Sequence, residues 1–260
     1  MKGYHPMNCY GMTDIGKRRE TNQDCFAATS YEDGALSYVL TVCDGMGGAN
    51  GGEIASQKAL EVYLSSLQSE LKDCDGDGAV KSALFQSVNL ANRAVYEAAD
   101  ADPSLSGMGT TLVSAVYVRE RGLYLINVGD SRAYLINSKE IKQISHDHSY
   151  VQHLVDIGEL SPSKAANHPQ RNIIMRAVGI SDEIKPDIDK INTDDFTYLL
   201  LCSDGLHGMI KDSDIKKLVT AKAQESVEEK VQALVALANK KGGNDNITVV
   251  LAKLTTDEER

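Results

Sequence analysis

The sequence predicts an α+β domain in which helices pack on antiparallel sheet. Between residues 110 and 144, four short strand-like runs rich in β-branched and apolar residues follow one another with only brief turns between them. These connections are too short for helical crossovers, so neighbouring strands are expected to run antiparallel. Two helical patterns precede this stretch and one follows it near the C-terminus, and such segregation is typical of a layered α+β fold.

The individual elements follow from the period of the apolar residues. The meander strands are expected at 111–118, 123–128, 133–136 and 141–144, and further strands at 38–42, 196–202 and 247–254. Three helices show apolar residues at helical spacing. Their apolar faces consist of Leu60, Leu64, Leu67 and Leu71 in the first helix, of Val80, Leu84, Val88, Ala91 and Val95 in the second, and of Val227, Val231, Leu234 and Ala238 in the last.

The chain is expected to form one domain over residues 1–260, because 260 residues with 42% hydrophobic composition can bury a substantial core. Residues 150–179 interrupt the order of elements with a helical stretch at 151–157 and two proline-containing breaks. An insertion of this kind beside a site can act as a cover or as a specificity element. A packed surface excursion is the equally weighted alternative.

Aspartates stand at the ends of several strand-like runs, and three of them are next to a glycine. Asp44-Gly45, Gly129-Asp130 and Asp204-Gly205 follow such runs, Asp245 precedes the last one, and Asp24 precedes Cys25. Carboxylates that repel one another persist at strand ends only if a cation holds them. Oxygen ligands suit hard ions such as Mg²⁺ or Mn²⁺, so this pattern predicts a site for more than one metal ion.

Charge and composition exclude several classes of partner. The chain has 37 acidic and 27 basic residues, for a net charge of -10, which argues against electrostatic binding to nucleic acid or to an anionic membrane. No apolar run resembles a signal peptide or a membrane span. The five cysteines include no C-x-x-C pair, which excludes a thiolate zinc site of that type. A cytoplasmic location is expected.

Other phosphate-handling chemistries lack their motifs. The glycine-rich segment 44–52 has Asn50 where a dinucleotide fingerprint needs glycine, and it lacks the G-K-[ST] of a phosphate-binding loop. No arginine stands at the spacing from a cysteine that a thiol-based phosphatase requires, and no serine-centred elbow is present. The glycines are better explained as freeing the backbone to turn tightly, so that the Gly45 carbonyl can face an ion held by Asp44.

Seven motifs in a fixed order carry a family resemblance. They are Arg19-x-x-Asn22-Gln23-Asp24, Asp44-Gly45-Met46-Gly47-Gly48, Gly107-Met108-Gly109-Thr110-Thr111, Gly129-Asp130-Ser131-Arg132, His168-Pro169-Gln170-Arg171, Ser203-Asp204-Gly205-Leu206 and Gly243-Asn244-Asp245-Asn246-Ile247-Thr248. This set resembles the metal-dependent serine/threonine phosphatases of the PPM, or PP2C, family, and most closely its bacterial branch, which opposes Hanks-type kinases. The resemblance spans residues 12–254.

The resemblance implies an α-β-β-α sandwich of two mostly antiparallel sheets flanked by helices, with Mn²⁺ or Mg²⁺ in a cleft at one end. Two ions are implied in the core site, and a third, weaker one is implied in bacterial members. By correspondence of motifs, Asp44 would bridge two ions and the Gly45 carbonyl would bind one of them. Asp204 and Asp245 would complete the set of ligands of the other ion. Asp24 would hold metal-bound water, and Asp130 would bind the third ion together with Asp204.

The same resemblance gives Arg19 the role of gripping the phosphate and makes residues 150–179 a mobile flap. It also leaves the proton donor unassigned, because Met46 and Ala49 stand here where some relatives have histidines. A thioether or a methyl group cannot protonate a leaving alkoxide. Either a metal-held water or His168, folded over the site by the flap, is the hypothesis for that proton donor.

The predicted activity is therefore hydrolysis of phosphoserine and phosphothreonine in signalling proteins, with a cognate kinase among the substrates and a monomeric enzyme. Two alternatives stay open. One is a catalytically silent regulatory domain, against which the presence of all five aspartates counts. The other is a metal-dependent hydrolase of small phosphate esters or nucleotides, whose metal centre would look the same.

Overall fold

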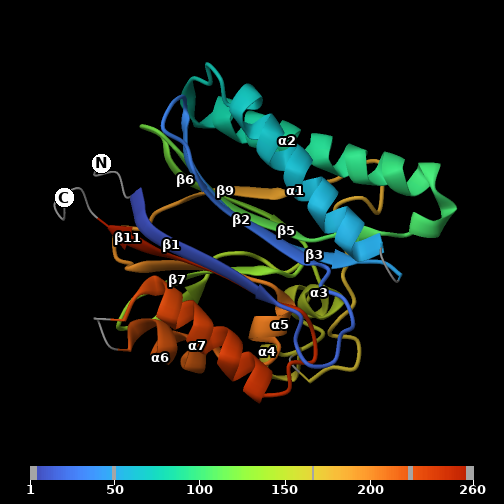
Figure 1. The fold of residues 1–260 in the computed structure, drawn as a ribbon, viewed down its shortest axis with the longest axis vertical. Coiled ribbons are helices and arrows are strands. Elements are labelled where there is room, and N and C mark those ends of the chain that lie inside the picture. Colours follow the sequence, from blue (N-terminus) through green and yellow to red (C-terminus); the bar gives the residue numbers. More distant parts are fainter. Residues whose placement is uncertain (1–4, 49–50, 166, 222–224, 256–260) are drawn as a thin grey trace.

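The computed structural model describes residues 5–48, 51–165, 167–221 and 225–255, and in it two antiparallel sheets lie face to face (Figure 1). All strand pairs within the two sheets are antiparallel. The first sheet has five strands. In order across it they are β1 (His5–Asp14), β11 (Ile247–Thr255), β10 (Tyr198–Cys202), β7 (Arg132–Ile136) and β8 (Ile141–Gln143).

The second sheet holds the remaining strands. In order across it they are β2 (Asp24–Ser30), β3 (Leu36–Met46), β5 (Leu112–Val118), β6 (Gly122–Val128) and β9 (Asp187–Ile191), and β4 (Gly109–Thr110) pairs with β3 beyond β5. The chain therefore passes from the second sheet to the first between β6 and β7. The expected antiparallel neighbours are found for β5 with β6 and for β7 with β8, whereas β6 and β7 do not pair, and Gly129, with φ +104°, lies where the chain turns toward the other sheet.

Helices cover the outer face of each sheet (Figure 1). The helices α1 (Gly51–Glu70) and α2 (Gly76–Ala101), with the 3₁₀ turn η1 (Pro103–Leu105), lie over the second sheet. The helices α6 (Asp212–Thr220) and α7 (Val227–Lys240) lie over the first, next to the short α5 (Asp204–His207). Three apolar cores fill the spaces between the four layers, and the middle one joins the two sheets. The predicted α-β-β-α sandwich is confirmed.

The face that α1 buries differs from the sequence prediction. The buried stripe runs through Ala55, Ala59, Tyr63 and Leu67, whereas Leu60 and Leu64 are only partly buried. Small alanines let the helix backbone approach β3 closely, so packing selects this stripe over the one with larger apolar side chains. Helices α2 and α7 bury the faces that their periodicity predicts.

The segment between β8 and β9 contains two short helices, α3 (Tyr150–Asp156) and α4 (Pro162–Ala165). Its ends are fixed by hydrogen bonds, from the Met175 amide to the His148 carbonyl at 2.7 Å and from the Val178 amide to the Thr110 carbonyl at 2.8 Å. The first bond joins the two ends of the predicted flap to each other, and the second attaches its C-terminal end to β4, which pairs with the end of β3. In the described part of the chain, no helix combines the length and apolar character needed to cross a bilayer.

We expect Leu84→Ala to lower the free energy of unfolding by about 2–5 kcal/mol, because Leu84 is 0% exposed and its removal leaves a cavity between α2 and the second sheet. Leu90→Ala on the same helix is the control, since Leu90 is 43% exposed and its loss opens no internal space. Urea unfolding of the two variants measures both effects. Equal losses would contradict the packing described for α2.

Candidate metal centre

Two of the predicted metal ligands stand directly opposite each other in the second sheet. Asp24 is the first residue of β2 and pairs with Asp44 of β3. Directly opposed residues of an antiparallel pair project from the same face of the sheet, here toward the other sheet. The Asp24 carboxylate confirms this direction, because its Oδ2 accepts hydrogen bonds from Ser203 Oγ at 2.8 Å and from Thr248 Oγ1 at 2.7 Å.

Strand β3 continues through Asp44 to Met46 rather than ending at the aspartate, because β4 pairs with its last two residues. Gly45 lies at a point where two backbones nearly touch. A Cβ atom there would come within 2.0 Å of the Gly52 carbonyl oxygen and 2.5 Å of the Gln23 carbonyl oxygen. Only glycine fits this approach of the α1 N-terminus to β2 and β3. Close packing, not backbone dihedral freedom, therefore requires glycine at position 45.

Asp130 and Asp204 come from the other strand ends. Asp130 lies in the turn that carries the chain from β6 to β7, and Asp204 is the first residue of α5, directly after β10. Burial raises the pKa of Asp204 to about 8, with further contributions from the negative charges of Asp130, Asp245 and Asp24. The structure thus brings all five predicted aspartates into mutual electrostatic range.

The pKa values of the other carboxyl groups in the cluster are raised as well. Burial raises the pKa of Asp24 to about 6, although the hydrogen bonds from Thr248 and Ser203 oppose this shift. Burial, followed by the charge of Asp147, raises the pKa of Asp130 to about 6. The pKa of Asp44 is raised well above its ordinary value by burial and by the four other aspartates. These shifts mean that the charged forms lack the solvation that water would give them.

The residues present fit divalent cations. Asp130 Oδ1 is buried and has no hydrogen-bond partner among the described residues, which leaves an oxygen free to bind an ion. No group of three or more His, Cys, Asp and Glu side chains among the described residues is arranged to hold a metal ion by itself. Mg²⁺-type sites commonly use one or two carboxylates and keep several waters, so a mixed set with the Gly45 carbonyl and water suits this arrangement.

Asp245 and Arg19 form an ion pair. Arg19 Nη2 lies 2.7 Å from Asp245 Oδ2, and the side chains are 52% and 32% exposed. The hydrogen bond to Asp245 raises the pKa of Arg19, with further contributions from the charges of Asp245, Asp204 and Asp44. The predicted phosphate-gripping arginine therefore lies beside the predicted ligands. In the structure, its partner is the carboxylate of one of these ligands, Asp245, rather than a phosphate.

Asn246 holds this part of the site together. Its side chain donates to the carbonyls of Ile15 and Thr21, both at 3.0 Å, and accepts from the Gln23 amide at 2.9 Å. The loop that carries Arg19 is thereby fixed to the strand that follows Asp245. Asn246 is buried, at 5% exposure, and its three hydrogen bonds give it a positioning role that its place in the sequence motif did not reveal.

A partly buried cation next to the Asp130 turn was not identified from the sequence. Arg132 makes three hydrogen bonds to Asp147, from Nε to both carboxylate oxygens at 3.0 Å and from Nη2 to Oδ2 at 2.7 Å, and its Nη1 donates to the Tyr134 hydroxyl. This pair joins β7 to the loop that leads into the flap. The only signal in the sequence was the position of Arg132 two residues after Asp130, and nothing local indicated its partner.

Two histidines flank the Asp130 turn. His207 Nε2 lies 3.1 Å from the Asp130 carbonyl oxygen, and burial lowers the pKa of His207 to about 3, so the neutral ring donates this hydrogen bond. His148 Nδ1 accepts from the Gly129 amide at 3.2 Å. Burial also lowers the pKa of His148, although Asp187 opposes the shift. Both rings position the backbone around Asp130.

The candidate proton donors remain apart from the carboxylates. His168 lies in the flap, where its Nδ1 accepts from the Gln170 amide at 3.2 Å, and none of its hydrogen bonds in the described region reaches an aspartate of the cluster. Met46 pairs with Gly109 at the end of β3. Ala49 lies outside the described residues. The role of His168 stays a prediction.

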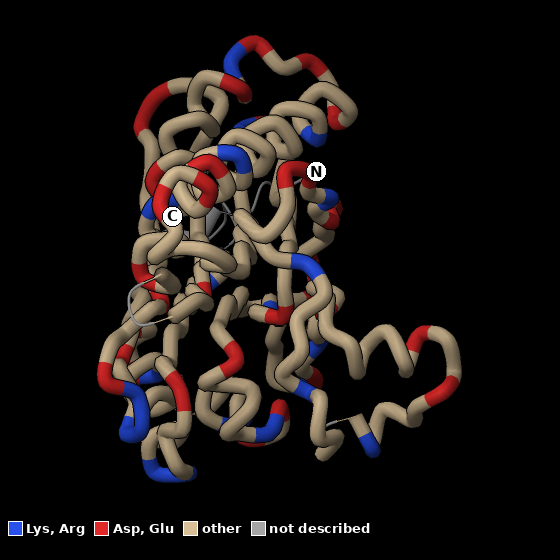
Figure 2. Tube along the Cα trace, turned by 90° about the vertical axis from the view of Figure 1, so that its right-hand side faces the viewer, with Lys and Arg blue, Asp and Glu red and all other residues tan. Residues whose placement is uncertain are grey.

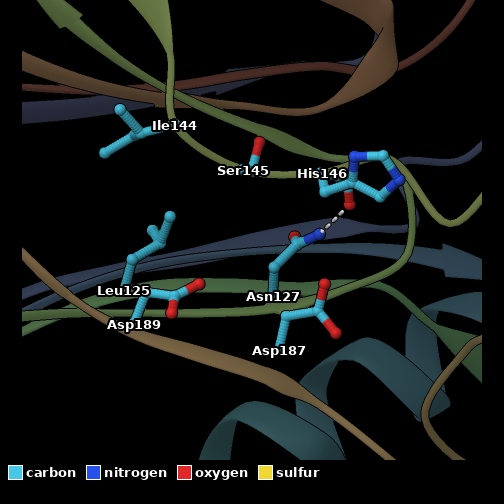
Figure 3. A pocket seen from close by; sticks show the side chains of 7 residues that line it. All are labelled: Leu125, Asn127, Ile144, Ser145, His146, Asp187 and Asp189. Atoms are coloured by element: carbon cyan, nitrogen blue, oxygen red, sulfur yellow. Dashed lines mark hydrogen bonds between the residues drawn. The ribbon is translucent and has the colours of Figure 1, made fainter.

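A pocket of about 260 Å³ lies beside the metal centre, between β6 and β9 on one side and the end of β8 on the other (Figure 3). It is lined by Leu125, Asn127, Ile144, Ser145, His146, Asp187 and Asp189. Asn127 donates to the His146 carbonyl at 2.7 Å (Figure 3). None of the five clustered aspartates lines this pocket, so it is not where the predicted chemistry takes place.

Comparison with known proteins agrees with the geometry. The family model described as protein phosphatase 2C matches residues 16–252. The serine/threonine phosphatase stp of Listeria welshimeri is 34% identical over 241 residues, which cover 93% of each chain. The protein phosphatase PhpP of Streptococcus pneumoniae is 35% identical over 248 residues, which cover 95% of this chain and 97% of PhpP.

Solved structures give the same result. The serine/threonine phosphatase Stp1 from Staphylococcus aureus superimposes with a TM-score of 0.85 at 35% identity, covering 98% of each chain. The catalytic domain of the serine threonine protein phosphatase PstP in complex with two manganese ions has a TM-score of 0.78 at 32% identity, covering 95% of this chain and 98% of that one. With its aspartates gathered at one end of a confirmed sandwich, the chain belongs to the protein phosphatase 2C family of metal-dependent phosphatases.

Proposed function

We propose that the protein hydrolyses phosphoserine and phosphothreonine in other proteins, using water activated by divalent cations. The observation that carries this proposal is the cluster of five aspartates whose charged forms destabilise one another in the absence of cations. The relatives named as serine/threonine phosphatases support the substrate class. A PstP structure in complex with two manganese ions supports Mn²⁺ as one suitable metal.

Within this proposal each residue has a distinct task. Asp44 and the Gly45 carbonyl would hold divalent ions together with Asp204 and Asp245. Asp24 would act through water, and Asp130 with Asp204 would hold a third ion. When bound, a pair of divalent ions supplies a nucleophile from water near neutral pH and neutralises charge on the phosphoryl group. The chain needs no nucleophilic side chain of its own.

Arg19 is the residue that binds the phosphate. A guanidinium group presents paired donors that match two phosphoryl oxygens. The Arg19–Asp245 pair is exposed, and exposed ion pairs contribute only about 0–1 kcal/mol, so little free energy opposes exchange of the carboxylate for a phosphate. His168 supplies the proton to the leaving serine or threonine oxygen after the flap folds over the site.

The alternatives receive less support. A silent regulatory domain is expected to lack metal-binding aspartates, whereas all five are present here. No feature of the site favours small phosphate esters over phosphoproteins. The cognate Hanks-type kinase as a substrate, the monomeric state, the cytoplasmic location and the exact set of ions remain predictions.

We expect Asp204→Asn to lower kcat/KM toward a phosphothreonine peptide by at least about 100-fold, because loss of even an indirect metal contact costs about 10–100-fold. Excess chelator should abolish phosphate release from the unaltered chain, and Mn²⁺ should restore it. Asp100→Asn, an exposed change in α2, is the control and should retain full activity. Phosphate release that survives both the chelator and Asp204→Asn would overturn the metal mechanism.

Metal binding should depend on pH in a defined direction. The raised pKa values of Asp24, Asp130 and Asp204 mean that protons favour the folded metal-free protein. Their stabilising contribution is complete below the unfolded pKa of about 4 and is lost as the pH rises through about 6 and about 8. Cations need the deprotonated groups, so their affinity should increase over the same interval.

Thermal unfolding measures this linkage. Without metal, the Tm should fall between about pH 5 and about pH 8, and the increase in Tm produced by saturating Mg²⁺ should widen as the pH rises. Asp204→Asn should flatten the upper part of this dependence. A Mg²⁺-induced change in Tm that is independent of pH would show that the carboxyl groups do not titrate as described.

The proton-donor hypothesis predicts a leaving-group effect for His168→Ala. Loss of a general acid typically costs about 10²–10⁴-fold, and the loss should be much smaller for p-nitrophenyl phosphate, whose leaving group needs no proton. The pH–rate profile on a phosphothreonine peptide should change as well. His153→Ala, which removes the exposed histidine of α3, is the matched control. Unchanged profiles, or equal losses on both substrates, would exclude His168 as the acid.

A further inference from the structure

Five basic side chains lie on two adjoining segments next to the metal centre. We call this group the basic rim. It consists of Lys17, Arg18, Arg19, Lys240 and Lys241, all of which are exposed. The first three follow strand β1, whereas the other two end helix α7 and begin the turn toward Asp245.

The two segments of the basic rim are held against each other. The Lys17 amide donates to the Gly243 carbonyl at 2.7 Å. A Cβ atom built on Gly243 would lie 3.2 Å from Lys17 Cγ, so the Lys17 side chain passes directly over this glycine. Asn239 Nδ2 also donates to Asp14 Oδ1 at 3.0 Å, which ties the last turn of α7 to the end of β1. The basic rim is therefore a fixed surface.

The basic rim begins at the proposed reaction centre. Arg19 pairs with Asp245, and the charges of Asp204 and Asp44 contribute to its raised pKa. Consecutive Cα atoms are about 3.8 Å apart, so the Cα of Lys17 lies at most about 8 Å from that of Arg19. A group bound by Lys17 or Arg18 would thus lie within about two to four residues of a phosphoryl group held by Arg19.

Four of these charges lack an opposite partner. None of Lys17, Arg18, Lys240 and Lys241 makes an ion pair within the described residues, although the whole chain has a net charge of -10. Elsewhere Lys and Arg are interspersed with Asp and Glu (Figure 2). The helix dipole accounts for lysines at the end of α7, but it does not account for Lys17 and Arg18, which lie in a turn outside any helix.

The nearby acids do not neutralise the basic rim. Asp14 Oδ1 already accepts hydrogen bonds from the Gly16 amide and from Asn239, and Asp245 is paired with Arg19. Glu20 is the remaining carboxylate of the loop and makes no ion pair in the described structure. Counting the side chains of these two segments, five positive charges face the three negative charges of Asp14, Glu20 and Asp245, and the charges of Asp44 and Asp204 in the metal centre also act on Arg19.

We infer that the basic rim binds a second anionic group of the phosphoprotein substrate, close in sequence to the phosphoserine or phosphothreonine that is hydrolysed. This inference rests on the proposed function and narrows its substrate class to phosphorylation sites in acidic or multiply phosphorylated segments. Carboxylate and phosphate share the chemistry that lysine and arginine recognise, and bidentate arginine contacts favour both. Most of the chain repels such segments, so the rim directs them to the metal centre.

The test uses three phosphothreonine peptides of one length. The residues flanking the phosphothreonine are glutamine in the first, glutamate in the second, and a second phosphoserine among glutamines in the third. With Mn²⁺ at low salt, the unaltered chain should have a KM about tenfold lower for the anionic peptides than for the neutral one, because several exposed pairs act together. The preference should shrink at high salt, and the comparison of the second and third peptides identifies which anion is preferred.

Variants that reverse the charge of the rim residues test whether these residues cause the preference for anionic peptides. The double variant Lys17→Glu/Arg18→Glu should lose the preference and keep its kcat on the neutral peptide, and Lys240→Glu/Lys241→Glu should reduce the preference. The matched control is Lys72→Glu/Lys81→Glu, which changes the net charge equally. Lys72 follows the end of α1, a helix of 20 residues and hence about 30 Å long, whose other end lies at Gly45.

The outcomes separate this inference from the function on which it rests. Equal KM values for all three peptides, or a loss of preference in the control variant as large as in the rim variants, would overturn the inference while leaving the phosphatase activity established. No phosphate release from any peptide would overturn the proposed function and the inference together. Turnover of the neutral peptide shows that each variant is folded.

Discussion

The rest of the structure depends on the repulsion among aspartates that the fold collects at one end of the two sheets. Asp44 has four carboxyl neighbours that raise its pKa, and Asp204 has three. Desolvation adds to this repulsion, because burial deprives each charged group of water. Such a cluster is unfavourable for an isolated chain and becomes favourable when cations bind. Contacts elsewhere in the fold must therefore contribute enough stability to keep the carboxylates close together when no cation is bound.

Neutral donors and one remote ion pair hold the cluster in place. Thr248 and Ser203 donate to the Asp24 carboxylate, the Asp44 amide donates to the Thr111 hydroxyl, and Arg132 binds Asp147 next to the Asp130 turn. The first two contacts engage Oδ2 of the Asp24 carboxylate, and the others orient the backbone of β3 and the loop next to Asp130. A cation such as Arg132 within the cluster would compete with the metals, whereas behind it the same charge only orders the loop.

The sequence predicted the layers because periodicity reports burial, and burial governs packing. It predicted the α2 face through Val80, Leu84 and Val88 correctly and misjudged the α1 face, because Ala55 and Ala59 have little hydrophobic signal but permit close approach to β3. It also could not show that β6 and β7 lie in different sheets, since both read as strands joined by a short turn. That crossing places Asp130 between the sheets.

The aspartates of the site could be predicted from the sequence, but the contacts that position them could not. The aspartates were recognisable because each stands at the edge of an apolar run, and three of them, Asp44, Asp130 and Asp204, are next to a glycine. The pairs that position them join residues far apart in sequence, such as Arg19 with Asp245 or His207 with the Asp130 carbonyl, and no local pattern encodes them. The need for glycine at position 45 could not be predicted from the local sequence either. It arises from Gly52 and Gln23, which approach Gly45 only in the folded chain.

Arg19 lies between the negatively charged aspartate cluster and the positively charged basic rim. On one side it faces the aspartate cluster, and on the other it continues into Lys17 and Arg18. Its pair with Asp245 is exposed, and such a pair is worth about 0–1 kcal/mol, so cations that bind Asp245 need not overcome a strong competitor. Cation binding at Asp245 would thus release Arg19 for an anion. Metal loading and phosphate recognition are then coupled through one exchangeable ion pair, and an anionic segment already held by neighbouring lysines would favour the exchange.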